Sequence, residues 1–188
     1  MRAPIRFTTK DLDLFPEPLD DTRYEIINGE LHVSRQPKAG HQFASGKVFY
    51  ALESWSTTTR NGLAMAAPGV VFAVDDAVAP DVIWIADERL QDGIDEAGHF
   101  RVAPDLMVEI LSPGSANELR DRELKLDLYS RYGVREYWIV DWRRHEVSVY
   151  RRSETALHIS LTLRDSDVLT SPLLPGFSCP ISQFWFTR

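Results

Sequence analysis

The spacing of apolar residues divides the first part of the chain into a hairpin and a helix. Residues 24–34 (YEIINGELHVS) place strand-forming residues on both sides of Asn28-Gly29, a pair that favours the tight turn of a β-hairpin. In residues 41–60 the apolar side chains recur at near-helical spacing, as shown by Phe43, Val48, Leu52 and Trp55. We therefore predict a hairpin followed by one long amphipathic helix.

The later segments alternate between strand and helix patterns. Residues 69–86 predict a second hairpin, residues 104–113 (PDLMVEILSP) a buried strand, and residues 117–132 a helix. Residues 136–152 predict two strands around a charged turn, and residues 171–186 predict an edge segment pinned by proline and aromatic packing. This order predicts an α/β fold with a mixed β-sheet flanked by helices.

Length and charge limit the class of protein. The chain has 188 residues and no low-complexity tract, which suits one domain with a single core. We expect residues 1–22, which include Pro4, Pro16 and Pro18, to form an irregular lead-in and residues 23–188 to form the domain. The net charge of −7 argues against a protein that coats nucleic acid, but it leaves room for an enzyme with a small basic cleft.

The chain shows no signal for export or membrane insertion. Its N-terminus lacks the basic, apolar and small-residue regions of a signal peptide, and no apolar run reaches membrane-spanning length. Cys179 is the only cysteine, so no intrachain disulfide can form. These features predict a cytoplasmic protein without a membrane-spanning segment.

One carboxylate lies inside the buried strand. Glu109 is surrounded by apolar residues that would cover both faces of the strand, namely Leu106, Met107, Val108, Ile110 and Leu111. A buried carboxylate costs several kcal/mol unless another group pairs with it. The sequence therefore predicts that Glu109 holds a partner.

Two Ala-Pro-Asp segments offer an acidic neighbour for Glu109. Asp81 begins the strand-like run 79–86, and Asp105 begins the strand that carries Glu109. If the two strands run antiparallel, the start of the first lies beside the end of the second, which brings Asp81 close to Glu109. Asp105 lies four residues before Glu109 on the same strand, about 13 Å away. Two adjacent carboxylates repel each other, so they need a cation, a shared proton or a basic group.

The predicted helix over residues 117–132 supplies a basic group. At about 100° per residue, Lys125 falls near the centre of the apolar face, with Asp121 one turn earlier, while Arg120 and Glu123 fall on the opposite side. Lys125 could lie along the core as the ion-pair partner of Asp121. Alternatively, it points over the sheet toward Asp81 and Glu109.

These motifs resemble a known family. The superfamily of PD-(D/E)XK nucleases carries two acidic residues and a lysine, and the set of Asp81, Glu109 and Lys125 is similar to it. The amino-acid sequence resembles one group more closely, the Uma-two family, also called domain of unknown function 820. Six segments resemble that family in order: YEIINGEL, HQ, APDVIWI, APDLMVEILSP, RDRELKLDLYSRYGVREYWIVD and LPGF. In the superfamily the lysine is expected two residues after Glu109, where this chain has Leu111. In the Uma-two family the next helix supplies the lysine instead. Lys125 matches that position.

The resemblance implies a restriction-endonuclease-like core and a metal-dependent DNA endonuclease. Asp81, Glu109 and the backbone carbonyl of about Ile110 would bind Mg²⁺, with Mn²⁺ as a substitute. Lys125 would orient or activate the attacking water. The implied partners are DNA and a second copy of the chain, since cutting both strands needs two active sites.

Three further residues are accessory candidates, and one alternative function stays open. His41 begins the long helix at a place where the superfamily sometimes carries an acidic residue that assists the metal. Glu30 in the hairpin and Asp121 beside Lys125 are the others. No CxxC, HExxH, phosphate-binding glycine loop or GxSxG motif supports a different enzyme class. The alternative is an inactive nuclease-fold protein that binds nucleic acid or a protein partner.

Overall fold

The computed structural model of the chain describes residues 5–12, 14–15, 22–91 and 93–186. Of the prolines expected in the lead-in, Pro4, Pro16 and Pro18 lie outside these ranges. The described part of the lead-in contains one helical turn, α1 (Thr9–Leu12), whose Thr9 N–H donates to the carbonyl of Val74. This part of the lead-in is therefore attached to the domain.

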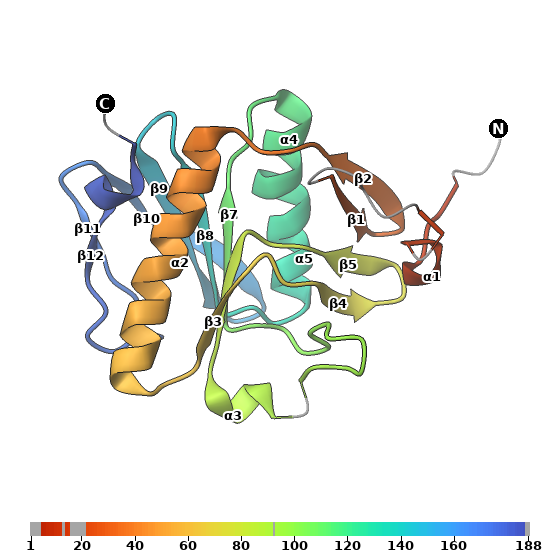
Figure 1. Cartoon of the computed structure of the whole chain (residues 1–188), viewed down its shortest axis with the longest axis horizontal. Helices are drawn as coiled ribbons and strands as arrows, with labels where there is room; N and C mark the ends of the chain where they lie inside the picture. The colour runs from red at the N-terminus through yellow and green to blue at the C-terminus, as the bar shows by residue number, and fades with distance from the viewer. Residues whose placement is uncertain (1–4, 13, 16–21, 92, 187–188) are drawn as a thin grey trace.

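A six-stranded mixed sheet forms the centre of the molecule (Figure 1). Its strands lie in the order β10-β9-β8-β7-β6-β3, and only the β7–β8 pair is parallel. The bounds are β3 (Leu63–Ala66), β6 (Val82–Ile85), β7 (Leu106–Ile110), β8 (Glu136–Asp141), β9 (Glu146–Ser153) and β10 (Ala156–Arg164). The predicted α/β class with a mixed sheet and flanking helices is confirmed.

Side-chain alternation along the central strands separates two hydrophobic cores. On β6, Val82 and Trp84 pack in the core beside α2 (Ala39–Thr59), whereas Ile83 and Ile85 pack in the core beside α5 (Lys125–Arg131). Successive strand residues point to opposite faces of the sheet. Asp81 therefore lies on the same face as Ile83, and Glu109 lies on the same face as Met107, which is the face beside α5. The pleat therefore places both residues on the same face of the large sheet.

A second, four-stranded antiparallel sheet has the order β2-β1-β5-β4. Its strands are β1 (Arg23–Ile27), β2 (Glu30–Ser34), β4 (Val70–Ala73) and β5 (Asp76–Val78). The predicted hairpin forms around Asn28 and Gly29, both at positive φ (52° and 73°), as a tight turn between right-twisted strands requires. The second predicted hairpin spans only β4 and β5, since β6 leaves it to join the large sheet.

The helix after β7 is continuous but not regular. It consists of α4 (Ser115–Leu119), one π-helical turn η1 (Arg120–Leu124) and α5. It lies beside both sheets (Figure 1). Tyr129 packs in the core beneath the large sheet, and Tyr132, which follows the helix, stacks on Phe72 of β4. A site between the two sheets can therefore receive side chains from this helix.

The remaining elements close the ends of the domain. They are α3 (Asp87–Leu90), the short strands β11 (Val168–Leu169) and β12 (Cys179–Pro180), and the 3-10 helix η2 (Ile181–Phe184). The tail was expected to be an edge segment pinned by proline and aromatic packing, and this packing is present, with the ring of Phe177 against that of Trp138. Leu174, Phe177, Ile181 and Phe184 are buried in the core beside α2, because proline-limited turns let them fill the space between helix and sheet.

Candidate active site

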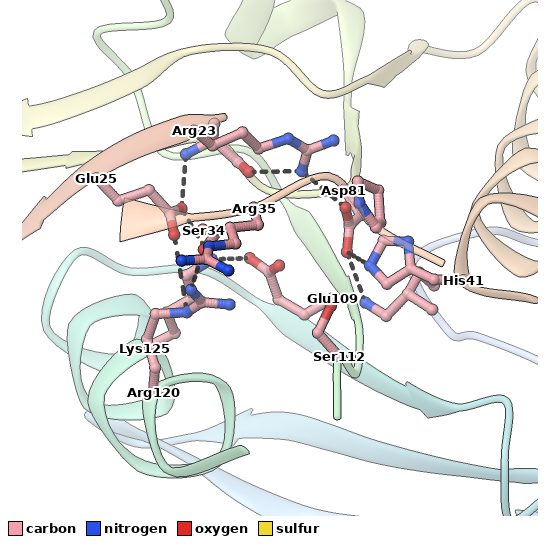
Figure 2. Close-up of a pocket in the computed structure, with 13 residues that line it drawn as sticks. Arg23, Glu25, Ser34, Arg35, His41, Asp81, Glu109, Ser112, Arg120 and Lys125 are labelled. Atoms are coloured by element: carbon pink, nitrogen blue, oxygen red, sulfur yellow. Dashed lines mark hydrogen bonds and ion pairs between the residues drawn. The ribbon is translucent and has the colours of Figure 1, made fainter. Parts of the chain in front are cut away.

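Asp81 and Glu109 meet at the edge of one pocket, on adjacent strands. The antiparallel register pairs Val82 of β6 with Val108 of β7, so the next position on each strand brings Asp81 beside Glu109. Both carboxylates line the pocket drawn in Figure 2 and are buried. The antiparallel arrangement expected from the two Ala-Pro-Asp segments is therefore present.

Glu109 receives two hydrogen bonds on one oxygen. Its Oε1 accepts from Lys125 Nζ at 2.9 Å and from the Tyr129 hydroxyl at 2.7 Å. Within the described chain no hydrogen bond falls on Oε2, which leaves that oxygen available to a ligand. Burial raises the pKa of Glu109 to about 8 despite the charge of Lys125, and repulsion by Asp121 and Asp81 adds to the rise.

Asp81 is held by three donors. Its Oδ1 accepts from Arg23 at 2.8 Å, and its Oδ2 accepts from the backbone N–H of Ile110 at 2.8 Å and lies 3.2 Å from His41 Nε2. Burial alone would raise the pKa of Asp81, but the bond from His41 and the charge of Arg23 outweigh it and lower the pKa to about 2. Asp81 is therefore an ionised carboxylate fixed against the end of β7.

The π turn decides which side chains of the helix enter the pocket. The Lys125 N–H donates to the carbonyl of Arg120, five residues back, so Arg120 lies one wide turn below Lys125 on the same face. Our expectation that Arg120 faces solvent is therefore wrong, because it assumed regular α-helical rotation. Arg120 is buried, with bonds to Asp121 (2.9 Å) and Ser34, whereas Glu123 is exposed as expected.

Lys125 bridges two carboxylates rather than serving Asp121 alone. Its Nζ lies 2.9 Å from Glu109 Oε1 and 2.9 Å from Glu25 Oε1, but 3.8 Å from Asp121 Oδ1. Burial would lower the pKa of Lys125, but the charges of Glu109 and Glu25 outweigh it and raise the pKa above its usual range. Lys125 is thus an ammonium ion in the interior.

The hairpin contributes Glu25, which the sequence analysis did not select, and not Glu30. Glu25 of β1 is buried and also accepts from the Ala79 N–H at 2.9 Å, whereas Glu30 is exposed and lies outside the pocket lining. Strand alternation explains the difference, since Glu25 shares the face of Ile27, a core residue. The sequence signal that could have identified Glu25 is its spacing of two residues from Ile27, which puts both side chains on the same face of the predicted strand.

His41 reaches the site from the other side of the sheet. It lies in the first turn of α2. The ring of Trp142 packs against this turn at Gly40, where any larger side chain would clash with it. Trp142 also donates a hydrogen bond to the carbonyl of Leu111, just after β7, so the turn lies close to the end of that strand. His41 is buried, and its Nδ1 has no hydrogen-bond partner in the described structure. Its Nε2 holds Asp81, as described above.

Asp105 belongs to a separate structural cluster. It is fully buried and accepts from the Ala86 N–H at 2.9 Å, from Arg89 at 2.8 Å and from Arg135 at 3.2 Å. These contacts join three connecting segments at the far end of β7. The structure therefore separates Asp105 from the pocket that holds Asp81.

The charges in the buried ion-pair network at the pocket do not balance. Among the described side chains, four buried carboxylates (Glu25, Asp81, Glu109 and Asp121) pair with three permanent cations (Arg23, Arg120 and Lys125), so 3 − 4 leaves one negative charge within the network. Arg35 also lines the pocket, but it is exposed and is not part of this network. A buried excess charge is costly and is relieved by a proton or a bound cation. The raised pKa of Glu109 identifies the group that takes the proton.

The donor set fits a cation that keeps much of its water. Within the described ranges no group of three or more His, Cys, Asp and Glu side chains is arranged to enclose a metal. Mg²⁺ is commonly bound by only one or two carboxylates, with water and substrate phosphate as its other ligands. Asp81 and Glu109, with the excess negative charge around them, match that requirement.

Within the described ranges, none of the helices combines the length and apolar character needed to span a bilayer.

The fold and the sequence both have known counterparts. The fold matches that of a protein from Anabaena variabilis ATCC 29413, described as a "putative nuclease belonging to DUF820", with a TM-score of 0.72 over 95% of this chain and 97% of that one. The two sequences are 19% identical. A comparison with curated proteins gave no match. The family model Uma2, described as "Putative restriction endonuclease", matches residues 11–182, and the chain therefore belongs to the Uma2 family.

Proposed function

We propose that this protein is a metal-dependent endonuclease that hydrolyses phosphodiester bonds of DNA at the pocket between β6, β7 and α5. The carrying observation is the meeting of Asp81 and Glu109 on adjacent antiparallel strands, with Lys125 2.9 Å from Glu109. Membership of the Uma2 family, with its description as restriction endonucleases, supports a nuclease function. The resemblance noted in the sequence assigns the same three residues.

Asp81, Glu109 and the backbone carbonyl of Ile110 would hold the metal, Mg²⁺ or Mn²⁺. When bound, the ion would stabilise negative charge that develops on the scissile phosphate. Asp81 is prepared for this role because its hydrogen bonds keep it ionised, and Glu109 would exchange its proton for the cation. The protein supplies the remaining positive charge through Lys125.

Lys125 would orient the attacking water rather than remove its proton. A base must be unprotonated, but the two carboxylates around Lys125 favour its charged form. An ammonium group fixed by Glu25 and Glu109 can instead donate hydrogen bonds to water and attract the phosphate. Glu25 and Tyr129 act as positioning residues, since they touch Lys125 and Glu109.

The alternative is a nuclease-fold protein that binds nucleic acid or a protein partner without cutting it. One observation favours it: both oxygens of Asp81 are already bound by Arg23, His41 and the Ile110 N–H, so metal binding must displace or share these donors.

A homodimer, with two sites for the two DNA strands, is part of the nuclease proposal. Light scattering after size-exclusion chromatography would measure that state.

Cleavage of supercoiled plasmid tests the proposal. With Mg²⁺ or Mn²⁺, we expect nicked and linear products from the wild type and from Glu123→Gln, whose side chain is exposed. Asp81→Asn and Glu109→Gln, which keep the shape of the carboxylates, should give no product. An intact plasmid with the wild-type protein and either ion would favour the binding protein.

A further inference from the structure

Four described cationic side chains lack any partner. Most arginines and lysines in the described ranges are engaged in ion pairs, hydrogen bonds or ring contacts. The exceptions within those ranges are Lys10, Arg35, Lys38 and Arg60. Two of them, Arg35 and Lys38, lie three residues apart in the connection between β2 and α2.

Arg35 and Lys38 line a groove that opens from the candidate active site. The groove lies between the β2–α2 connection and the segment after β7, where Ser112 of the turn and Asn117 of α4 complete its wall. Arg35 and Ser112, both labelled in Figure 2, also line the pocket of Asp81 and Glu109, so the groove adjoins that pocket. A ligand lying in the groove would therefore end at the two carboxylates.

The groove is free of acidic side chains in an acidic protein. No Asp or Glu lines it, and the sequence from residue 31 to residue 52 contains none, although the whole chain has a net charge of −7. Both cations are exposed. Two unpaired cations in such surroundings produce a local positive potential that attracts an anionic ligand.

The start of helix α2 adds to this potential. Lys38 is its N-cap residue, no side chain caps the free N–H groups of the first turn, and no acidic residue lies in that turn. The N-terminus of a 21-residue helix carries a partial positive charge. The helix end and the two side chains therefore act in the same direction.

We infer that this groove binds the phosphate backbone of a DNA strand next to the scissile phosphate, with Arg35 and Lys38 contacting phosphates. The inference rests on the proposed nuclease function and adds to it the path of the substrate. Contacts of this kind position the strand without reading its sequence. The binding should therefore be independent of base composition and strongly dependent on salt.

Fluorescence anisotropy with a labelled DNA duplex and a labelled single strand, in EDTA and over a range of NaCl concentrations, tests the inference without requiring cleavage. The test variant is Arg35→Gln/Lys38→Gln. The matched control is Lys10→Gln/Arg60→Gln, which removes the other two unpaired cations. Each double variant loses two positive charges and moves the net charge from −7 to −9, so total charge cannot distinguish them.

We expect the groove variant to bind DNA roughly ten- to a hundredfold more weakly at about 0.1 M salt. The plot of the logarithm of the association constant against the logarithm of the salt concentration should become less steep, with the slope smaller in magnitude by about 1 to 2. The control variant should bind like the wild type, and both should melt like it. Equal binding by the groove variant and the wild type would overturn the inference, even if plasmid is cleaved. Weakened binding by the groove variant alone would support the groove even if no plasmid is cleaved, in which case only the catalytic proposal fails.

Discussion

Lys125 Nζ lies 2.9 Å from Glu109 Oε1, although 16 residues separate them in the sequence. The same nitrogen lies 2.9 Å from Glu25 Oε1, so one lysine joins carboxyl groups from both sheets. All three groups are buried. The lysine assigned to catalysis therefore also stabilises the junction of the sheets, and its substitution affects folding as well as chemistry.

Lys125→Met should lower the stability of the protein as well as its activity. Methionine keeps the apolar stem but leaves Glu25 and Glu109 without their shared cation, which costs on the order of 3 to 5 kcal/mol. The melting temperature measured at pH 8 should fall clearly below that of the wild type. Adding Glu109→Gln should restore part of the loss without restoring cleavage, whereas a Lys125→Met protein as stable as the wild type would contradict the bridging role.

Divalent metal should stabilise the wild-type protein. A ligand that binds only the native state stabilises it by about 2.7 kcal/mol at a concentration one hundred times its dissociation constant. We expect Mg²⁺ or Mn²⁺ to raise the melting temperature, and Asp81→Asn or Glu109→Gln to remove most of that rise. A wild-type melting curve unchanged at millimolar metal would count against the site.

Stability without metal should fall as pH rises toward 8. Burial raises the pKa of Glu109 from an ordinary value of 4.5 to about 8, so between these values the folded protein holds a proton that the unfolded chain has released. The contribution of this proton to stability is fully present below about pH 4.5 and is lost as pH passes 8. Glu109→Gln cannot titrate, so chemical denaturation from pH 5 to 8.5 should show a weaker decline for this variant.

Metal binding should respond to pH in the opposite sense. Glu109 must lose its proton before it can serve as a ligand, so the metal-induced rise in melting temperature should grow between pH 6 and 8. Melting curves with and without Mn²⁺ at each pH measure this. A metal effect equally large at pH 6 and pH 8 would show that Glu109 does not exchange a proton for the ion.

Asp105→Asn should affect stability without affecting the metal site. Asp105 is fully buried and bonds the Ala86 N–H, Arg89 and Arg135, and weakening such bonds costs about 1–3 kcal/mol. Its cluster lies at the opposite end of β7 from Glu109. The variant should melt earlier than the wild type but keep the full stabilisation by Mn²⁺, and loss of that stabilisation would mean that the two clusters are coupled.

Local sequence determined several of the elements and three members of the candidate site. The Asn28-Gly29 turn, the long helix and the buried strand of Glu109 follow from backbone preferences and apolar spacing, which act over a few residues. Asp81 and Lys125 were identifiable because a carboxylate at the start of an apolar strand and a lysine on an apolar helix face both conflict with simple burial. Their catalytic roles stay predictions.

Only the tertiary structure decided how these groups are joined. Strand β6 left its neighbour β5 for the other sheet, a choice between two pairings that the apolar pattern allows equally. Arg120 entered the pocket through a π turn, where its side chain bonds Asp121 and Ser34, and regular helix periodicity does not predict this position. Glu25 became the second carboxylate of Lys125 because the two sheets meet at that helix. The sequence by itself determined which residues were too polar for their surroundings, and long-range packing determined which of them neutralise one another.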